Sequence, residues 1–105
     1  MSAKSKAPQP SLEEILQTLQ GQRTALKENY RIKSLGVFGS YVRSDNKPKS
    51  DLDLLVEFDR VPTMFEFVRL ERYLTAILGV KVDLVMKSAL KPEIGKRILA
   101  EVVPV

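Results

Sequence analysis

The sequence predicts an α/β protein of the α+β kind, in which helices pack on a small mixed β-sheet. Helix-type and strand-type patterns alternate along the chain in the order α-β-α-β-α-β-α, as expected when helices cover a sheet. With 105 residues, of which 44% are hydrophobic, the chain is long enough for one domain with a modest core. We therefore expect a single domain over residues 11–105. A flexible tail rich in Lys, Ser and Pro is expected over residues 1–10.

The first predicted helix follows this tail. Ser11 and Glu14 have the spacing of a capping box, in which each side chain accepts a hydrogen bond from the other residue's backbone N–H. Gly21 weakens the helix by about 1 kcal/mol relative to alanine, so we expect it to bend or fray there. The apolar stripe of this helix comprises Leu12, Ile15, Leu16, Leu19 and Leu26.

Two strands and a short helix are predicted next. Residues 32–38 are typical of a first strand and residues 51–58 of a second. Between them we expect a short helix over residues 40–43 and a polar loop over residues 45–50.

The second half of the chain begins with another helix. Thr63 and Glu66 form a second capping box, and the helix continues through Leu78 to end at Gly79. Residues 80–86 predict a third strand.

A last helix is predicted to begin near Pro92, because proline is favoured in the first turn of a helix. Its residues Ile94, Ile98 and Leu99 should point inward. The apolar segment 102–105 that follows has two interpretations, and the sequence leaves both open. It either docks on another protein or covers the sheet.

A pair of aspartates carries the clearest functional signal. Asp51 and Asp53 are spaced i, i+2, so on a strand they point from the same face, with Cα atoms roughly 6.6 Å apart. Two carboxylates about 4 Å apart would repel by roughly 4 kcal/mol at an effective dielectric near 20, which favours a bound cation. Oxygen ligands without imidazole or thiolate nearby favour Mg²⁺ or Mn²⁺ over zinc.

A glycine-serine turn lies just upstream of this pair. Gly39 and Ser40 stand where the first strand ends and a helix begins, and unpaired backbone N–H groups at such a point bind phosphate. Arg43 lies one helical turn past Ser40 and could contribute a positive charge. A phosphate-binding turn next to a metal-binding pair predicts a site for a metal-bridged nucleoside triphosphate.

Each of these features also has a simpler explanation. Asp51 and Asp53 could form the solvated side of a half-exposed strand, and Gly39-Ser40 could be only a turn. Asp83, in the third strand, could be a lone charge. The combination of the three features favours a site over separate explanations for each.

The composition excludes several kinds of chemistry. The chain has no Cys and no His, which removes thiol nucleophiles, zinc clusters, disulfides and histidine bases. There is no apolar run long enough to span a membrane and no apolar signal stretch at the N-terminus, so we expect a cytoplasmic location. The net charge of +4 suits anionic ligands, although such an excess is as often only a solvated surface.

These residues resemble the signature of the minimal nucleotidyltransferase (MNT) proteins, small members of the DNA polymerase β-like superfamily. The resemblance runs from about Leu35 to the C-terminus. One departure is Ser44, where many relatives have glycine directly after the arginine. The motifs that carry it are Gly39-Ser40-x-x-Arg43, then Ser50-Asp51-x-Asp53-Leu54-x-Val56, and later Val82-Asp83-Leu84-Val85.

The resemblance implies the polymerase β-like nucleotidyltransferase fold and a set of roles. Asp51, Asp53 and Asp83 would be the catalytic and metal-binding residues, holding Mg²⁺ or Mn²⁺, with two ions expected. Gly39, Ser40 and Arg43 would bind the nucleotide, and ATP is implied by the family alone.

The resemblance also implies a partner. It points to the antitoxin half of HEPN/MNT toxin-antitoxin modules, in which the MNT protein transfers AMP to a tyrosine hydroxyl of a helical ribonuclease toxin. Two alternatives stay open: a nucleotidyltransferase that acts on RNA or a small molecule, and a noncatalytic antitoxin that neutralises its toxin by binding. Direct nucleic-acid binding is possible but less favoured.

Overall fold

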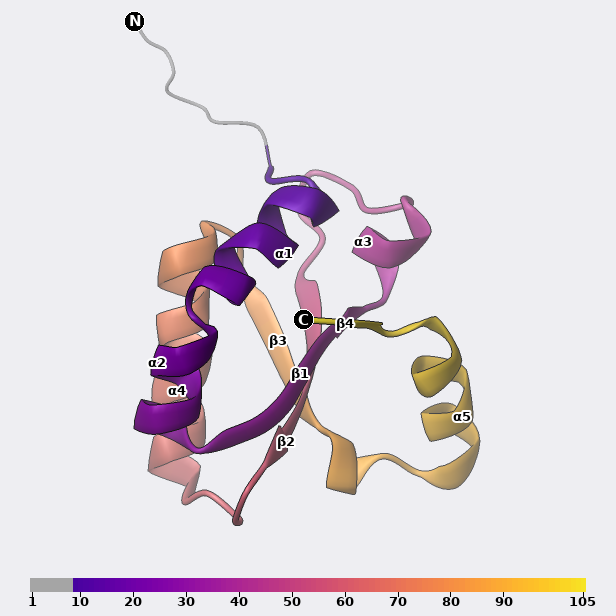
Figure 1. The fold of residues 1–105 in the computed structure, drawn as a ribbon. Helices are drawn as coiled ribbons and strands as arrows, with labels where there is room; N and C mark the ends of the chain where they lie inside the picture. The colour runs from indigo at the N-terminus through magenta and orange to yellow at the C-terminus, as the bar shows by residue number, and fades with distance from the viewer. Residues whose placement is uncertain (1–8) are drawn as a thin grey trace, which may run out of the picture.

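The structure, a computed structural model, describes residues 9–105 and shows them as a four-stranded sheet in the order β3-β2-β1-β4 (Figure 1). β1 is antiparallel to β2 and to β4, whereas β2 and β3 are parallel, so the predicted mixed sheet is confirmed. All but the last two residues of the predicted flexible tail, residues 1–10, lie outside the described residues. The strands are β1 (Ile32–Phe38), β2 (Leu52–Phe58), β3 (Val82–Met86) and β4 (Val103–Pro104).

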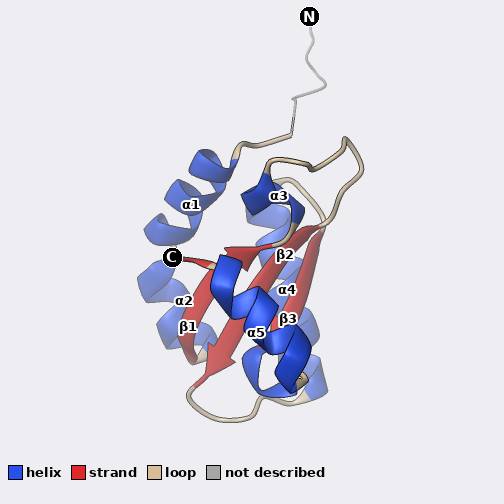
Figure 2. Cartoon of the chain, turned by 90° about the vertical axis from the view of Figure 1, so that its right-hand side faces the viewer, coloured by secondary structure: helices blue, strands red, loops and turns tan. Residues whose placement is uncertain are grey.

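Helices lie on both faces of the sheet (Figures 1 and 2). One face is covered by α1 (Leu12–Gly21), α2 (Arg23–Tyr30) and α4 (Met64–Leu78), and the other by α5 (Pro92–Glu101). The short helix α3 (Ser40–Arg43) follows β1, and a 3₁₀ turn, η2 (Lys87–Ala89), follows β3. The predicted α+β class is therefore confirmed. In the part of the chain that the structure describes, no helix combines the length and the hydropathy needed to cross a membrane.

The hydrophobic core lies between the sheet and the helices α1, α2 and α4. Leu52, Leu54 and Val56 of β2 are completely buried in it, as the alternation of the sequence predicts. Asp53, which alternates with them, is half-buried and lines a cavity together with residues of α5. The carboxylate of Asp53 thus faces α5, away from the core.

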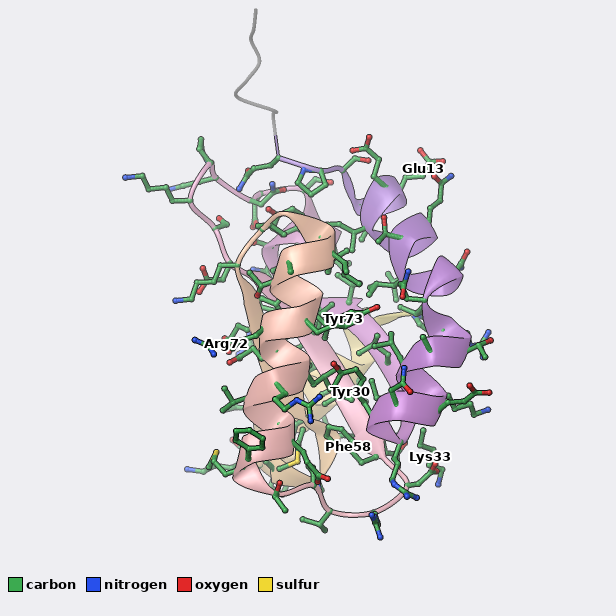
Figure 3. All side chains as sticks on the ribbon, turned by 90° about the vertical axis from the view of Figure 1, so that its left-hand side faces the viewer. Glu13, Tyr30, Lys33, Phe58, Arg72 and Tyr73 are labelled. Carbon is green, nitrogen blue, oxygen red and sulfur yellow. The ribbon has the colours of Figure 1, made fainter. Side chains whose placement is uncertain are left out.

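The helices on the core side also contact one another. Figure 3 shows the rings of Tyr30 in α2 and Tyr73 in α4 beside each other, and their centroids are 5.5 Å apart.

The helix ends follow the local signals of the sequence. Both capping boxes are present: Ser11 and Glu14 exchange bonds of 2.8 and 3.1 Å, and Thr63 and Glu66 exchange bonds of 2.9 and 3.1 Å. Gly79 ends α4 with a φ of 71°, in the left-handed region that glycine adopts without strain.

The first predicted helix is two helices. The chain departs from helical geometry at Gln22, which has φ −100° and ψ 4°, so α1 ends at Gly21 and α2 begins at Arg23. The break falls where the sequence predicts a bend. It lets Leu19 and Leu26 both reach the core although they belong to different helices.

The last helix does not bury the three apolar residues that the sequence predicts to point inward: Ile94 and Ile98 line a cavity beside the sheet, and Leu99 lies outside its lining. Ile94 and Leu99 are 54% and 48% exposed, Ile98 is half-buried, and the buried residue of α5 is Gly95. The reason is that this face of the sheet carries Asp53 beside the apolar Leu55, so a helix gains little by packing flat against it. A cavity of about 440 Å³ lies between this face and α5 instead.

The apolar segment 102–105 covers the edge of the sheet. Val103 and Pro104 form β4 opposite Val37 and Gly36, and Val105 N–H donates to the carbonyl of Leu35 at 2.9 Å. Gly36 is needed for this approach, because a Cβ there would lie 2.6 Å from a methyl group of Val102 and 3.2 Å from a backbone oxygen of β4. Of the two interpretations of this segment, the structure supports the one in which it covers the sheet.

Candidate active site

Gly39 forms the turn between β1 and α3. Its φ of 84° favours glycine, and a Cβ built at this position would collide with the carboxylate of Asp53. The carbonyl of Gly39 accepts hydrogen bonds from the N–H groups of Val42 and Arg43 at 3.0 and 3.2 Å. The turn is therefore packed directly against a site carboxylate, which is a closer relation than the sequence predicts.

Asp53 lies between the other two aspartates of the predicted site, Asp51 and Asp83. It pairs with Phe38 across the antiparallel β1 and β2, and with Asp83 across the parallel β2 and β3. Residues in register on neighbouring strands point from the same face, so Asp53 and Asp83 lie side by side. Asp51 stands two residues before Asp53, just ahead of the start of β2, and both Asp51 and Asp83 are exposed.

The surroundings of Asp53 raise its pKa to about 6. Burial is the largest cause, followed by the negative charges of Asp83 and Asp51, with a smaller contribution from Glu101. Arg43 acts in the opposite direction. Each neighbouring carboxylate disfavours the ionised form, and a bound cation would relieve this repulsion.

The residues suit a hard divalent cation in kind, because carboxylate oxygens are the ligands that Mg²⁺ and Mn²⁺ prefer. Within residues 9–105, however, no three acidic side chains lie close enough, as they stand, to hold an ion between them. The structure thus brings Asp53 and Asp83 into register with Asp51 nearby, without gathering the three carboxylates around one point.

Glu101, the last residue of α5, is a site residue that the sequence does not predict. Its carboxylate accepts a hydrogen bond from Gly39 N–H at 2.7 Å, and Nη1 of Arg43 donates to both carboxylate oxygens at 3.2 Å. Arg43 also forms an ion pair with Asp45 at 3.3 Å. The hydrogen bonds to Asp45 and then to Glu101 raise the pKa of Arg43 above its ordinary value. The turn and the arginine thus hold an oxyanion, here one from the protein itself.

These groups surround the cavity between the sheet and α5. Of the predicted site residues, Gly39, Arg43 and Asp53 line it, whereas Ser40, Asp51 and Asp83 stand outside its lining. The other lining residues are Phe38 of β1 and four residues of α5, namely Ile94, Arg97, Ile98 and Glu101. Helix α5 therefore contributes half of the wall. No sequence motif marks these four residues of α5 as part of a site. The one available signal is that α5 is followed closely in the sequence by the segment that forms β4.

Tyr41, which follows Ser40 in α3, lies buried close to the same carboxylates. Burial raises its pKa above the ordinary value, and the negative charge of Asp51 raises it further. Its hydroxyl makes no hydrogen bond with the described residues. We assign it no role in the site.

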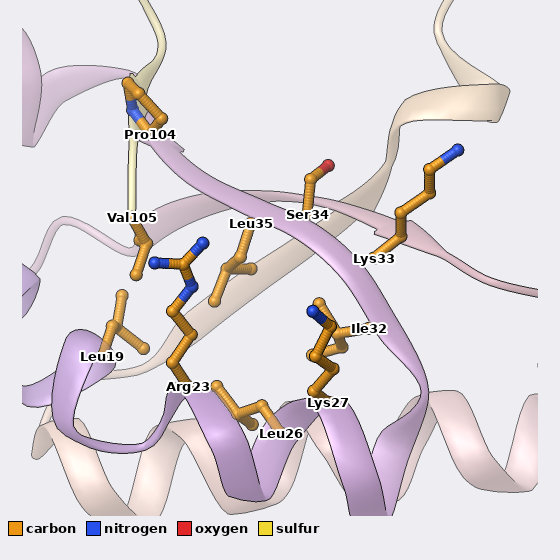
Figure 4. A pocket seen from close by; sticks show the side chains of 10 residues that line it. All are labelled: Leu19, Arg23, Leu26, Lys27, Ile32, Lys33, Ser34, Leu35, Pro104 and Val105. Atoms are coloured by element: carbon orange, nitrogen blue, oxygen red, sulfur yellow. The ribbon is translucent and has the colours of Figure 1, made fainter.

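A second, more enclosed cavity of about 260 Å³ lies between α2, β1 and the C-terminus (Figure 4). None of the predicted site residues lines it. Its lining combines apolar side chains with Ser34 and three cationic residues, namely Arg23, Lys27 and Lys33. We place the site at the aspartates, because no carboxylate lines this second cavity to hold a metal ion or to accept a proton during group transfer.

Comparisons with known proteins agree with the fold. Residues 19–105 match the family model described as a nucleotidyltransferase domain. The chain is 50% identical over 93 residues to the protein adenylyltransferase MntA of Thermococcus cleftensis, covering 89% of this chain and 94% of that protein.

Two solved structures have the same fold. One, provisionally described as a minimal nucleotidyltransferase, superposes with a TM-score of 0.70 at 36% identity and covers 86% of this chain and 95% of that chain. The other is the complex of the tri-AMPylated HEPN toxin of Shewanella oneidensis with its MNT antitoxin. It superposes with a TM-score of 0.61 at 18% identity, covering 84% of this chain and 69% of that chain, and is evidence for the fold alone.

The family match and the similarity to a protein adenylyltransferase place the chain in one enzyme class, the nucleotidyltransferases. This chain belongs to the nucleotidyltransferase domain family, within which it is a minimal nucleotidyltransferase.

Proposed function

We propose that this protein transfers AMP from ATP to a tyrosine hydroxyl of a HEPN ribonuclease toxin, and thereby acts as an antitoxin. The observation that carries the proposal is the position of an oxyanion-binding turn directly against Asp53, which is itself in register with Asp83. The protein adenylyltransferase MntA, at 50% identity, supports AMP transfer to a protein. The S. oneidensis complex motivates the choice of a HEPN toxin as acceptor.

The phosphates of ATP would bind where Glu101 now binds. Gly39 N–H and the guanidinium of Arg43 are donors already aimed at an oxyanion, and Ser40 begins α3 directly after Gly39. The same donors would stabilise the charge that develops on the departing pyrophosphate.

The carboxylates would hold the metal and move the proton. Asp51 and Asp53 would hold one Mg²⁺ or Mn²⁺ ion, and a second ion would be shared with Asp83. Ions held there would neutralise phosphate charge and acidify the attacking hydroxyl. The tyrosine oxygen forms a bond to the α-phosphorus, and the bond from that phosphorus to the bridging oxygen of pyrophosphate breaks. Pyrophosphate leaves with the electron pair of the broken bond. The hydroxyl proton passes to a carboxylate, for which the exposed Asp83 is available.

Co-expression with a cognate HEPN protein tests the proposal. We expect a complex, and we expect mass increments of one or more AMP groups on the toxin when the purified proteins are incubated with ATP and Mg²⁺. Replacing Asp51 and Asp53 together with asparagine should remove both the increments and the relief of toxicity. Asp59→Asn, which changes an exposed aspartate just past the end of β2, is the matched control and should retain both.

The alternatives predict different outcomes in the same experiment. Relief of toxicity that persists in the double variant without any mass increment would favour a noncatalytic antitoxin. Label from radioactive ATP that appears on RNA or on a small molecule, and not on the toxin, would favour a different acceptor.

A further inference from the structure

The carboxylate of Glu101 occupies a position that the proposed function assigns to phosphate. It is held by three hydrogen bonds: one from Gly39 N–H at 2.7 Å and two from Nη1 of Arg43 at 3.2 Å. A carboxylate with both oxygens engaged by a guanidinium and a backbone N–H is bound as an oxyanion ligand would be. The side chain is only 26% exposed, so this contact is partly withdrawn from water.

The fold brings Glu101 to this point although it lies 62 residues from Gly39 in the sequence. Glu101 ends α5, and β4 begins two residues later. β4 pairs with Gly36 and Val37 of β1, the strand that leads directly into Gly39. The end of α5 is thereby tied to the strand that positions the turn.

Glu101 and a nucleotide phosphate cannot use these donors together. The single N–H of Gly39 points at one acceptor, and two oxyanions at hydrogen-bond distance from the same donor repel each other. Binding of a triphosphate at the turn therefore requires the carboxylate to leave. The cavity of about 440 Å³ that Glu101 lines gives the side chain room to turn aside while β4 stays paired. Arg97, one helical turn earlier and lining the same cavity, is a cation that the displaced carboxylate can meet.

We propose that Glu101 is a built-in competitor of the nucleotide, which occupies Gly39 and Arg43 in the free protein and lowers the affinity for triphosphate. This inference rests on the proposed function, since it takes the turn as the phosphate site. The competing group belongs to α5, so occupancy of the site by nucleotide is coupled to the conformation at the end of this helix.

Calorimetric titration with inorganic triphosphate and with a non-hydrolysable ATP analogue, both with Mg²⁺, tests the competition. Glu101→Gln keeps the size of the side chain and removes its charge, and we expect it to bind both ligands about fivefold or more tightly than the parent. Glu101→Asp shortens the side chain by one methylene and should also bind more tightly, because the carboxylate is drawn back from the turn. Glu93→Gln, an exposed position on the same helix that does not line the cavity, should bind as the parent does.

The amide resonance of Gly39 gives a second readout that a purely structural role for Glu101 would not predict. In the parent, adding triphosphate should shift this resonance as one acceptor replaces another. In Glu101→Gln it should lie at a different position before any ligand is added.

The outcomes separate this inference from the proposed function. A parent that binds triphosphate, with Glu101→Gln and Glu101→Asp binding equally or more weakly, would overturn the competition and leave the proposed function standing. If neither the parent nor the two variants binds triphosphate at all, the turn is not a phosphate site, and the proposed function and this inference are both overturned.

Discussion

At the scale of single residues, the site is organised around Asp53. Its carboxylate is half-buried and lies where a Cβ at Gly39 would be, and the residue stands in register with Asp83. One residue thus links the other aspartates to the glycine turn. Changes at Asp53 should affect both the electrostatics and the packing of the site.

Asp53→Asn should abolish AMP transfer, and without metal it should be as stable as the parent or more so. The pKa of this carboxyl is raised from 3.8 to about 6 in the folded protein, so the folded state holds its proton more tightly than the unfolded state. Its contribution to stability therefore falls as the pH rises through this window. The advantage of the asparagine variant should grow over the same interval and level off above it. Because the group is only half-buried, screening by solvent should limit the advantage to about 1 kcal/mol.

Urea unfolding of the parent and of Asp53→Asn from pH 4 to pH 8, without divalent metal, measures this difference. Asp59→Asn is again the control for the loss of one exposed negative charge. A difference in stability between parent and Asp53→Asn that does not change with pH would show that the folded protein does not raise the pKa of Asp53.

Gly39→Ala should remove nucleotide binding and reduce stability more than Gly79→Ala does. Gly79 is in the left-handed helical region (φ 71°, ψ 17°), where alanine costs about 1–2 kcal/mol. Gly39 has φ 84° and ψ −152°, a region that essentially only glycine adopts, where alanine costs about 1–3 kcal/mol. Only at Gly39 does the new Cβ meet another group, the carboxylate of Asp53, while at Gly79 it meets nothing within 4 Å. Thermal unfolding and calorimetry with the ATP analogue give the two measurements. If Gly39→Ala and Gly79→Ala lose the same stability, and Gly39→Ala binds the ATP analogue as the parent does, the turn at Gly39 only shapes the backbone and does not bind phosphate.

At the scale of elements, α5 and β4 act as one unit. The helix supplies half of the wall of the site cavity, and the strand that follows fixes its end to β1. Since β4 comprises only Val103 and Pro104, its position depends on close contact with Gly36. The site is therefore sensitive to packing at a point that is not part of it.

Gly36→Ala should destabilise the protein by about 1–3 kcal/mol, because its Cβ would meet Val102 at 2.6 Å and the backbone of Val103 at 3.2 Å. The matched control is Gly21→Ala, where nothing lies within 4 Å of the new Cβ. Gly21 ends α1 without a positive φ, so alanine there should stabilise by about 0.4–1 kcal/mol. Urea unfolding at one pH measures both. If Gly36→Ala proves neutral, β4 is not held at the distance described.

At the scale of the whole molecule, the charge distribution is uneven. The chain carries a net charge of +4, yet the site gathers Asp51, Asp53, Asp83 and Glu101 around one end of the sheet. The free protein therefore holds a local excess of negative charge that a divalent cation with nucleotide can relieve. Ligand binding should accordingly be visible in the stability of the whole fold.

The parent should melt at a higher temperature when Mg²⁺ and the ATP analogue are present together. A ligand at about 100 times its dissociation constant adds about 2.7 kcal/mol, which for a domain of this size raises Tm by roughly 10–20 °C. Replacing both Asp51 and Asp53 with asparagine should remove most of this rise in Tm, whereas Asp59→Asn should keep it. Melting curves of the parent that coincide with and without both ligands would contradict the nucleotide site.

The sequence by itself determined what depends on neighbours within a few residues. Both capping boxes, the end of α4 at Gly79 and the break near Gly21 come from bonds or conformations within one helical turn. The two-residue period of β2 likewise places Leu52 and Leu54 in the core with Asp53 on the opposite face, because alternate side chains of a strand point to opposite faces. The roles of the site residues remain proposals, although the structure brings three of them around one cavity.

Only the tertiary structure decided which distant segments meet. The burial of the apolar stripe of α5 was predicted wrongly, because helical periodicity identifies such a stripe but not whether the facing sheet is apolar enough to bury it. The strand β4 is too short to have a period of its own. Glu101 reaches Gly39 across 62 residues only because β4 pairs with β1. Such a contact depends on the path of the chain in space, whereas local sequence patterns depend on the geometry of a single helix or strand.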